Sequence, residues 1–349
     1  CFVRHGYTPY FLVGGATGQI GDPKDNAERE LKPLDEIEHN KAALARQIIR
    51  VTHSDENAAI VDNLDWFKDV KFLPFLREIG KCFSMTQLLD RQFVQNRIGE
   101  GGAGISYAEF SYTLIQGYDF LHLFREHNVT LQLCGADQFG NCTSGIHLMS
   151  RLENATADCY SCPLIIDKVT GRKFGKSEGN AVWLDANKTS IFDFYQFWLN
   201  QSDEALEDYF KYFTFVTPEE LDKILSRHRE NPGARYGQAR LAELVTAIVH
   251  GEDAATAAKK ITAIVFGDGK LTDLSTDEVE LFAKSFPTAT FGSLIDILVA
   301  TGLASSKGEA RKLIAGNAIS INGQKVTADQ AISELSLIKK GKNKFALVR

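Results

Sequence analysis

The sequence predicts an α/β domain, then an all-α region, then a small α+β domain, and three observations support this prediction. Residues 1–189 alternate short apolar strands, such as "YFLVGG" and "VTLQLCG", with helical stretches. Residues 190–270 show the 3.6-residue periodicity of helices throughout. Residues 291–349 contain two short helical patterns and a hairpin signal. The acidic, glycine-containing stretch "GDGKLTDLSTDEVE" over 267–280 indicates a connection, and residues 271–290 are predicted to be a linker between the last two regions.

A glycine-rich loop, "GGATGQIGDP" over residues 14–23, follows the first predicted strand. The spacing of Gly15, Gly18 and Gly21 suggests a backbone shaped to approach a phosphate, as in dinucleotide-binding loops. Such loops run directly into a helix with an apolar face, whereas here the chain continues as "DPKDNAERELKP". We therefore disfavour a nucleotide-dependent oxidoreductase and expect the loop to present Asp22 to a cation, such as a substrate ammonium.

The segment "EFSYTLIQGYDFLHLF" places three polar side chains on one face of an apolar helix. Tyr112, Gln116 and Asp119 follow the spacing i, i+4 and i+7. Nearly every other position is large and apolar, which predicts that the helix is buried. Because buried polar groups need partners, the stripe predicts a small-molecule site. The alternatives are a purely structural network and a solvent-facing stripe.

The stretch "LQLCGADQFGN" ends a predicted apolar strand in Gly135, Asp137 and Gln138. Ligands of open α/β sheets bind at the carboxyl ends of strands, so these residues are candidate ligand contacts. Gln132 could point from the strand into the same pocket.

The loop "GRKFGKSEG" carries Lys173, Lys176 and Ser177 around a glycine. Two lysines and a glycine suit a mobile clamp on a polyphosphate, because the lysines neutralise charge and the glycine lets the loop close. The glycine spacing before Lys-Ser is not that of a P-loop.

Charge is distributed unevenly along the chain. The net charge of −6 argues against indiscriminate nucleic-acid binding, but residues 291–349 carry +5 and the first 290 residues carry −11. In this tail we predict a helix capped at Ser305 or Ser306, and Arg311 and Lys312 on it are candidate RNA contacts. The alternative is a solvated basic surface on a domain present for stability.

The tail also carries two local stop signals. Gly316 is predicted to end its second helix, and Asn322-Gly323 is predicted to form a hairpin turn.

Six cysteines are scattered along the chain, and only "CYSC" has C-x-x-C spacing. No second such pair completes a zinc site, so we predict free thiols and no metal site. No apolar run reaches about 18 residues, so no membrane span is expected.

Together, "GGATGQIGDP", "Y-x3-Q-x2-YDF", "GADQFGN" and "KFGKS" resemble the motifs of bacterial and mitochondrial tyrosyl-tRNA synthetases, which are class I aminoacyl-tRNA synthetases. The resemblance covers essentially the whole chain, with "KFGKS" at 173–177 similar to the KMSKS loop. It implies a Rossmann-like catalytic domain over 1–189, a helical anticodon-binding domain over 190–270 and a small RNA-binding domain over 291–349. The implied reaction joins L-tyrosine to ATP, releases pyrophosphate and passes the tyrosyl group to the 3′ end of tRNA(Tyr).

The resemblance also implies roles for individual residues. Asp22, Tyr112 and Gln116 would hold the tyrosine ammonium, Asp119 would accept from the phenol hydroxyl, and Gln132 would line the pocket. Gly135, Asp137 and Gln138 would contact the ribose and adenylate, and Lys173, Lys176 and Ser177 would stabilise the pyrophosphate. The resemblance further implies Mg²⁺ on the phosphates, a homodimer, and a cytoplasmic location, or the mitochondrial matrix for an organelle enzyme.

One feature of the family pattern is missing. No H-x-G-H motif occurs, and the chain starts at Cys1 rather than Met. We expect that an N-terminal piece with the first strand is absent and that residues 1–349 alone are nearly inactive. The alternative is a non-catalytic RNA-binding relative that has lost this strand.

Overall fold

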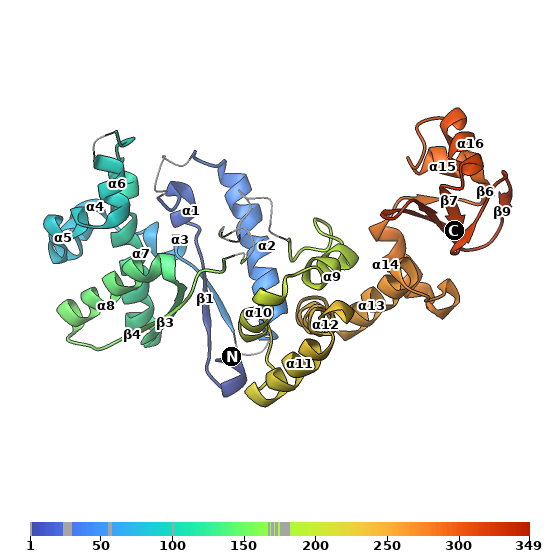
Figure 1. Ribbon diagram of the computed structural model, residues 1–349. Helices are drawn as coiled ribbons and strands as arrows, with labels where there is room; N and C mark the ends of the chain where they lie inside the picture. The colour runs from blue at the N-terminus through green and yellow to red at the C-terminus, as the bar shows by residue number, and fades with distance from the viewer. Residues whose placement is uncertain are drawn as a thin grey trace. The chain divides into compact units, whose positions relative to one another are not determined.

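The computed structural model describes residues 2–23, 30–54, 58–99, 101–166, 168, 171, 174 and 182–349. The chain divides into two compact units, Cys1–Ile166 and Asp167–Arg349 (Figure 1). The predicted catalytic domain, 1–189, therefore extends beyond the first unit. No helix in the described ranges has the length and apolar character needed to cross a membrane.

The first unit is an α/β structure built on two pairs of parallel strands. Its strands are β1 (Tyr10–Val13), β2 (Ala59–Asp62), β3 (Leu131–Gly135) and β4 (Asp158–Cys162). Its α-helices are α1 (Thr17–Ile20), α2 (Leu34–Thr52), α3 (Leu64–Phe67), α4 (Phe72–Glu78), α5 (Met85–Leu89), α6 (Gln92–Ile98), α7 (Tyr107–His127) and α8 (Phe139–Glu153). Strand β1 pairs with β2, and β3 pairs with β4. A parallel pair needs a crossover, and α2 and α8 supply the two crossovers.

Helix α7 is the buried helix that the apolar sequence around the polar stripe predicts. It begins at the cap Ser106, whose side chain accepts from the backbone N–H of Glu109 at 3.3 Å. It packs on α8 through a core that includes Phe120 and Leu148. The two helices approach closely, since a Cβ added to Gly145 would lie 2.7 Å from Cβ of Phe120. This packing fixes the polar face of α7 within the unit.

The second unit contains a helical region and a small mixed α+β region. Its helices are α9 (Ile191–Leu199), α10 (Leu206–Phe213), α11 (Pro218–Glu230), α12 (Tyr236–His250), α13 (Glu252–Phe266), α14 (Thr276–Ser285), α15 (Leu294–Ala300) and α16 (Lys307–Ala315). Its strands are β5 (Thr288–Ala289), β6 (Gly292–Ser293), β7 (Ile319–Ile321), β8 (Gln324–Lys325), β9 (Ala331–Ile332), β10 (Ser336–Lys340) and β11 (Lys344–Val348). Strands β5, β11, β10, β7 and β8 form one sheet in that order.

Local signals in this unit are confirmed. Ser306 caps α16 by accepting from the N–H of Glu309 at 3.2 Å. Gly316 is the C-cap of α16. The turn between β7 and β8 has positive φ at Asn322 (48°) and Gly323 (83°), as a tight hairpin requires.

The segment predicted to be a linker is instead folded into the second unit. Residues 271–290 contain α14, whose Phe282 is fully buried, and β5, which pairs with β11. Alternate residues of β11 pack into different cores: Phe345 packs with the α14 cluster, and Ala346 packs with the α15–α16 cluster. The small sheet therefore lies between two layers of helix.

Candidate functional site

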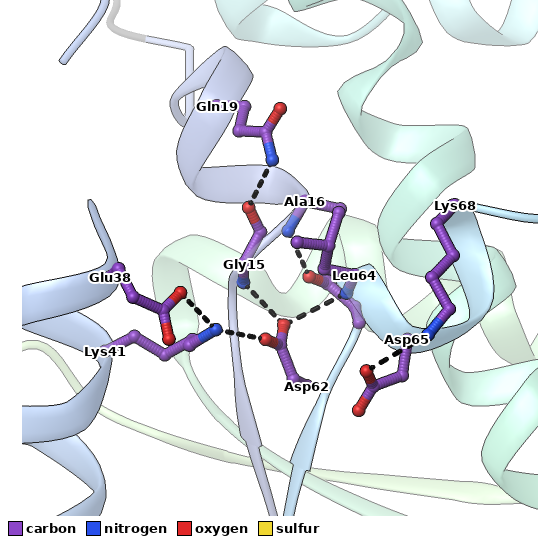
Figure 2. Close-up of polar contacts among 10 residues, drawn as sticks. Gly15, Ala16, Gln19, Glu38, Lys41, Asp62, Leu64, Asp65 and Lys68 are labelled. Atoms are coloured by element: carbon purple, nitrogen blue, oxygen red, sulfur yellow. Dashed lines mark hydrogen bonds and ion pairs between the residues drawn. The ribbon is translucent and has the colours of Figure 1, made fainter. Parts of the chain in front are cut away.

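The glycine-rich loop is held by the end of strand β2. Figure 2 shows the N–H of Gly15 donating to Oδ1 of Asp62 at 3.0 Å, and Leu64 N–H donating to the same oxygen at 3.0 Å. The N–H of Ala16 donates to Oδ1 of Asn63 at 2.7 Å. Figure 2 also shows Lys41 Nζ pairing with Oδ2 of Asp62 at 2.6 Å. This hydrogen bond raises the pKa of Lys41.

These contacts explain one of the glycines. A Cβ added to Gly15 would overlap Oδ1 of Asp62, so only glycine lets the loop backbone approach this carboxylate. The close approach inferred from the spacing is real at this position, but its partner is a side chain of the protein itself. The loop continues into the single-turn helix α1 rather than into a long helix.

Replacing Gly15 with alanine should destabilise the protein by about 1–3 kcal/mol, because the added methyl group forces the loop away from Asp62. Urea unfolding of the variant and the parent protein measures this loss. Gly80→Ala is the control, since its Cβ would meet only Leu76 at ordinary contact distance, 3.4 Å. Equal losses for the two variants would contradict the anchoring role of Gly15.

Asn63 links the loop to the polar face of α7. Its Nδ2 donates to Oγ1 of Thr17 at 3.1 Å and to Oδ2 of Asp119 at 3.2 Å. The other oxygen of Asp119 accepts from Nε1 of Trp66 at 2.9 Å. Asp119 is 4% exposed, and burial raises its pKa to about 7 despite these two donors. This cluster of polar side chains thus contains a buried carboxyl group whose pKa lies near neutral pH.

Two glutamines, one on α7 and one on β3, have buried side-chain oxygens that could accept hydrogen bonds. Among the described residues, Oε1 of Gln116 on α7 and Oε1 of Gln132 on β3 are buried without a hydrogen-bond partner. Tyr112, the third residue of the stripe, is also buried. Because buried polar atoms are normally paired, unpaired acceptors of this kind suit a ligand that brings donors.

The structure brings Asp22 and Gln138 together, although they are 116 residues apart. Gln138 Nε2 donates to Oδ2 of Asp22 at 3.0 Å, and Gln138 Oε1 accepts from Nδ2 of Asn141 at 3.0 Å. Asn141 Oδ1 accepts from Oγ1 of Thr113 at 3.0 Å, and Thr113 accepts from Arg91 at 3.0 Å. A chain of hydrogen bonds therefore joins the glycine-rich loop, α8 and α7.

The other predicted residues fall into three groups. Gly135 ends β3, and Asp137 follows it in an exposed turn. Arg311 and Lys312 are exposed on α16. Lys173, Lys176 and Ser177 lie outside the described residues.

Sequence reasoning missed several residues of the site. Asp62 and Asn63 could have been found, because they follow the apolar strand "AAIV" just as Gly135 and Asp137 follow β3. Trp66 and Arg91 have no comparable sequence signal, since their contacts depend on packing.

Comparisons with known proteins cover both units. Residues 1–267 match the family described as tRNA synthetases class I (W and Y), and residues 278–349 match the tyrosine–tRNA ligase SYY-like C-terminal domain. A tyrosine–tRNA ligase from Lactiplantibacillus plantarum is 42% identical over 356 residues, covering 100% of this chain and 84% of that protein. One from Anaeromyxobacter dehalogenans is 42% identical, covering 99% and 86%.

Solved structures of tyrosyl-tRNA synthetases are also similar to this chain. A C-terminally truncated mitochondrial tyrosyl-tRNA synthetase from Coccidioides posadasii superposes with a TM-score of 0.63 at 27% identity, covering 74% of this chain and 75% of that one. The corresponding Aspergillus nidulans enzyme gives a TM-score of 0.62 at 29% identity, covering 71% and 74%.

Proposed function

The chain belongs to the class I tRNA synthetases for tryptophan and tyrosine, and we propose which of its residues carry out the tyrosine–tRNA ligase reaction that this membership gives it. The observation that carries the proposal is the buried carboxyl of Asp119, held between Asn63 and Trp66 on the polar face of α7. A phenol hydroxyl is a donor of the size and polarity that such a carboxylate accepts.

Tyrosine binds with its hydroxyl on Asp119 and its ammonium toward Asp22, Tyr112 and Gln116. The unpaired Oε1 of Gln116 supports this orientation, because an ammonium brings three donors. The unpaired Oε1 of Gln132 lies on β3, from which it lines the same pocket. Asp22 is held by Gln138, so the ammonium site and the adenylate turn share one hydrogen-bond chain.

ATP is the second substrate, and its adenylate lies against Gly135, Asp137 and Gln138. The tyrosine carboxylate attacks the α-phosphate, a bond to that phosphorus forms, and pyrophosphate leaves with its electron pair. Lys173, Lys176 and Ser177 stabilise the leaving group. No protein nucleophile is needed because the attacking carboxylate is already charged, so positioning and electrostatics supply the catalysis.

Mg²⁺ accompanies the phosphates of ATP. Within the described ranges, the only group of three or more His, Cys, Asp or Glu side chains with ligand atoms close together consists of cysteines. Those thiols do not suit Mg²⁺, which prefers oxygen ligands. Mg²⁺ bound with the phosphates of ATP would supply charge neutralisation there.

Tyrosine-dependent exchange of labelled pyrophosphate into ATP tests the assignment. The full-length protein should catalyse exchange with tyrosine and not without it. A protein that binds tRNA but never exchanges pyrophosphate would be the non-catalytic relative, and this function would be wrong.

The enzyme acts in the cytoplasm, where charged tRNA is consumed by translation.

The basic C-terminal region binds tRNA through exposed residues of α16. Deleting residues 289–349 would expose Phe282 and its neighbours, so charge removal is the better test. Arg311→Ala with Lys312→Ala should weaken tRNA binding and lower the log–log salt slope by about 1–2, since each phosphate contact releases counterions. Filter binding at several salt concentrations measures both.

Lys307→Ala is the matched control for this pair, because Lys307 lies on the same helix but is paired with Asp296 at 2.6 Å. It should change the slope less. If the double variant kept the parental affinity and slope, the basic residues of α16 would be a solvated surface.

The enzyme is a homodimer through the apolar face formed by α4, α5, α6 and the start of α7, which lie together in Figure 1. Its exposed residues are Phe72, Leu73, Met85, Leu89, Ile98 and Tyr107. Leu73 is 75% exposed and Phe72 is 63% exposed, which is unusual for large apolar side chains. A second copy of the chain would cover this face with the same face.

Leu73→Glu should weaken dimerisation at least about tenfold, because a charge would be buried in an apolar interface. Analytical ultracentrifugation measures the dissociation constant. Leu44→Glu, on α2, replaces another exposed leucine, 53% exposed and outside these helices, and should leave the dimer intact. A parent protein that sediments as a monomer at all concentrations would contradict the proposal.

A further inference from the structure

Three cysteines from three elements converge in the first unit. Cys134 is on β3, Cys142 on α8 and Cys159 on β4, and their sulfur atoms all lie within 4.8 Å of one another. The Sγ atoms of Cys134 and Cys159 are 3.6 Å apart, so they are not joined in a disulfide. Cys142 is buried, and the other two are half-buried.

Strand geometry brings these residues together. Strands β3 and β4 are parallel with Gln132 opposite Cys159, and side chains alternate between faces along each strand. Cys134, two residues after Gln132, therefore shares a face with Cys159. Cys162 is three residues further along β4, on the other face, and is exposed. The C-x-x-C pair of the sequence is thus split, and only one of its members joins the cluster.

We propose that Cys134, Cys142 and Cys159 form a three-thiolate site for one soft metal ion of the Cu(I) class. A metal–sulfur bond of about 2.3 Å places three sulfurs around one ion about 4.0 Å apart. The separations in the cluster, 3.6 Å for one pair and no more than 4.8 Å for the others, bracket this value. Each thiol releases its proton to solvent as its sulfur binds the ion, so three protons leave for one ion bound.

The number of ligands favours Cu(I) over zinc. Soft thiolates select Cu(I) and Zn²⁺, but structural zinc sites hold four protein ligands. Within the described ranges the cluster contains three metal-binding side chains and no fourth. Three sulfurs complete a trigonal Cu(I) site, so the ion needs no further group from the protein.

The site borders the turn that we assign to the adenylate. Cys134 immediately precedes Gly135, and Cys142 lies on α8 directly after the turn that contains Gln138. An ion bound here would hold the ends of β3, β4 and α8 together. If the proposed function holds, the position of the site next to this turn predicts that bound Cu(I) raises the KM for ATP at least threefold in pyrophosphate exchange.

Anaerobic titration of the full-length protein with Cu(I), in competition with a chromogenic Cu(I) chelator, tests the site directly. We expect one ion per chain with at least about 100-fold loss of affinity in Cys134→Ser, Cys142→Ser and Cys159→Ser. Cys82→Ser and Cys162→Ser are the controls and should bind as the parent does. X-ray absorption of the loaded protein should show three sulfur ligands.

The outcomes separate this proposal from the proposed function. The Cys134→Ser/Cys159→Ser variant keeps the buried Cys142. If the parent protein bound Cu(I) no more tightly than this variant, the proposed site would be wrong. Loss of binding in Cys162→Ser instead would show capture by an exposed thiol and would also overturn it. Protein that binds Cu(I) as expected but never exchanges pyrophosphate would leave the site standing and overturn the catalytic assignment.

Discussion

Replacing Asp119 with alanine should lower kcat/KM for tyrosine by about 10- to 100-fold and change the value for phenylalanine little. The substitution removes the buried carboxyl that we propose as the acceptor of the phenol hydroxyl, and a hydrogen bond to a charged group contributes about 1.5–3 kcal/mol. Phenylalanine makes no such bond, so the ratio of the two substrates falls. Paired pyrophosphate-exchange assays with each amino acid measure this ratio.

The pKa of Asp119 adds a second measurement. With a pKa near 7, the carboxyl is mostly ionised at pH 8 and mostly protonated at pH 6. The ionised form is the better acceptor for the phenol hydroxyl, so tyrosine affinity should fall as the pH is lowered through 7. The affinity for phenylalanine should not follow this profile, and Asp119→Asn should flatten the profile for tyrosine.

Two variants protect this test against loss of folding. Asp119→Ala leaves the donors of Asn63 and Trp66 unpaired, whereas Asp119→Asn keeps the shape of the side chain. Glu126→Ala removes an exposed carboxylate from the same helix and should leave the substrate ratio unchanged. A parental ratio in Asp119→Ala would mean that this carboxyl does not contact the substrate.

Replacing Lys176 with alanine should slow adenylate formation by on the order of 100-fold or more, with little change in tyrosine affinity. In the proposed mechanism the loop neutralises the pyrophosphate mainly in the transition state, and removing one such charge-stabilising donor has an effect of about this size. Single-turnover kinetics measure the rate, and fluorescence titration measures tyrosine binding.

Lys168→Ala is the matched control for Lys176→Ala. Lys168 lies nearby in the sequence and is paired with Asp208 at 2.7 Å, so it is already neutralised. It should keep a nearly parental rate. If Lys176→Ala lost tyrosine affinity while the chemical rate stayed normal, the role assigned to the loop would be wrong.

Local signals predicted local structure well. The cap at Ser306, the stop at Gly316 and the Asn322-Gly323 turn each depend on residues within a few positions of one another. The linker prediction failed because it gave more weight to the nearby glycines and the acidic residues of 267–280 than to a helix-start signal in the same stretch. Ser275 and Glu278 form a capping box that starts α14, and this pattern is readable from the sequence.

The polar site was only partly predictable, because its partners come from distant segments. The sequence singled out Asp119 from its helical spacing, but its donors Asn63 and Trp66 belong to the end of β2 and to α3. The spacing around Gly15 indicated close backbone approach, yet it could not identify Asp62 as the partner. The pairing of β1 with β2 brings these residues together, and no local pattern specifies that pairing.

Asn63 both anchors the glycine-rich loop and donates a hydrogen bond to Asp119 in the proposed tyrosine site. Local opening of the loop away from β2 therefore also disrupts the site around Asp119. A single opening free energy describes both changes. A ligand that occupies the pocket stabilises only the closed form, and it suppresses the opening in proportion to its concentration over its dissociation constant. On our assignment of the site, substrate binding thus lowers how often the amides of Gly15 and Ala16 become open to solvent.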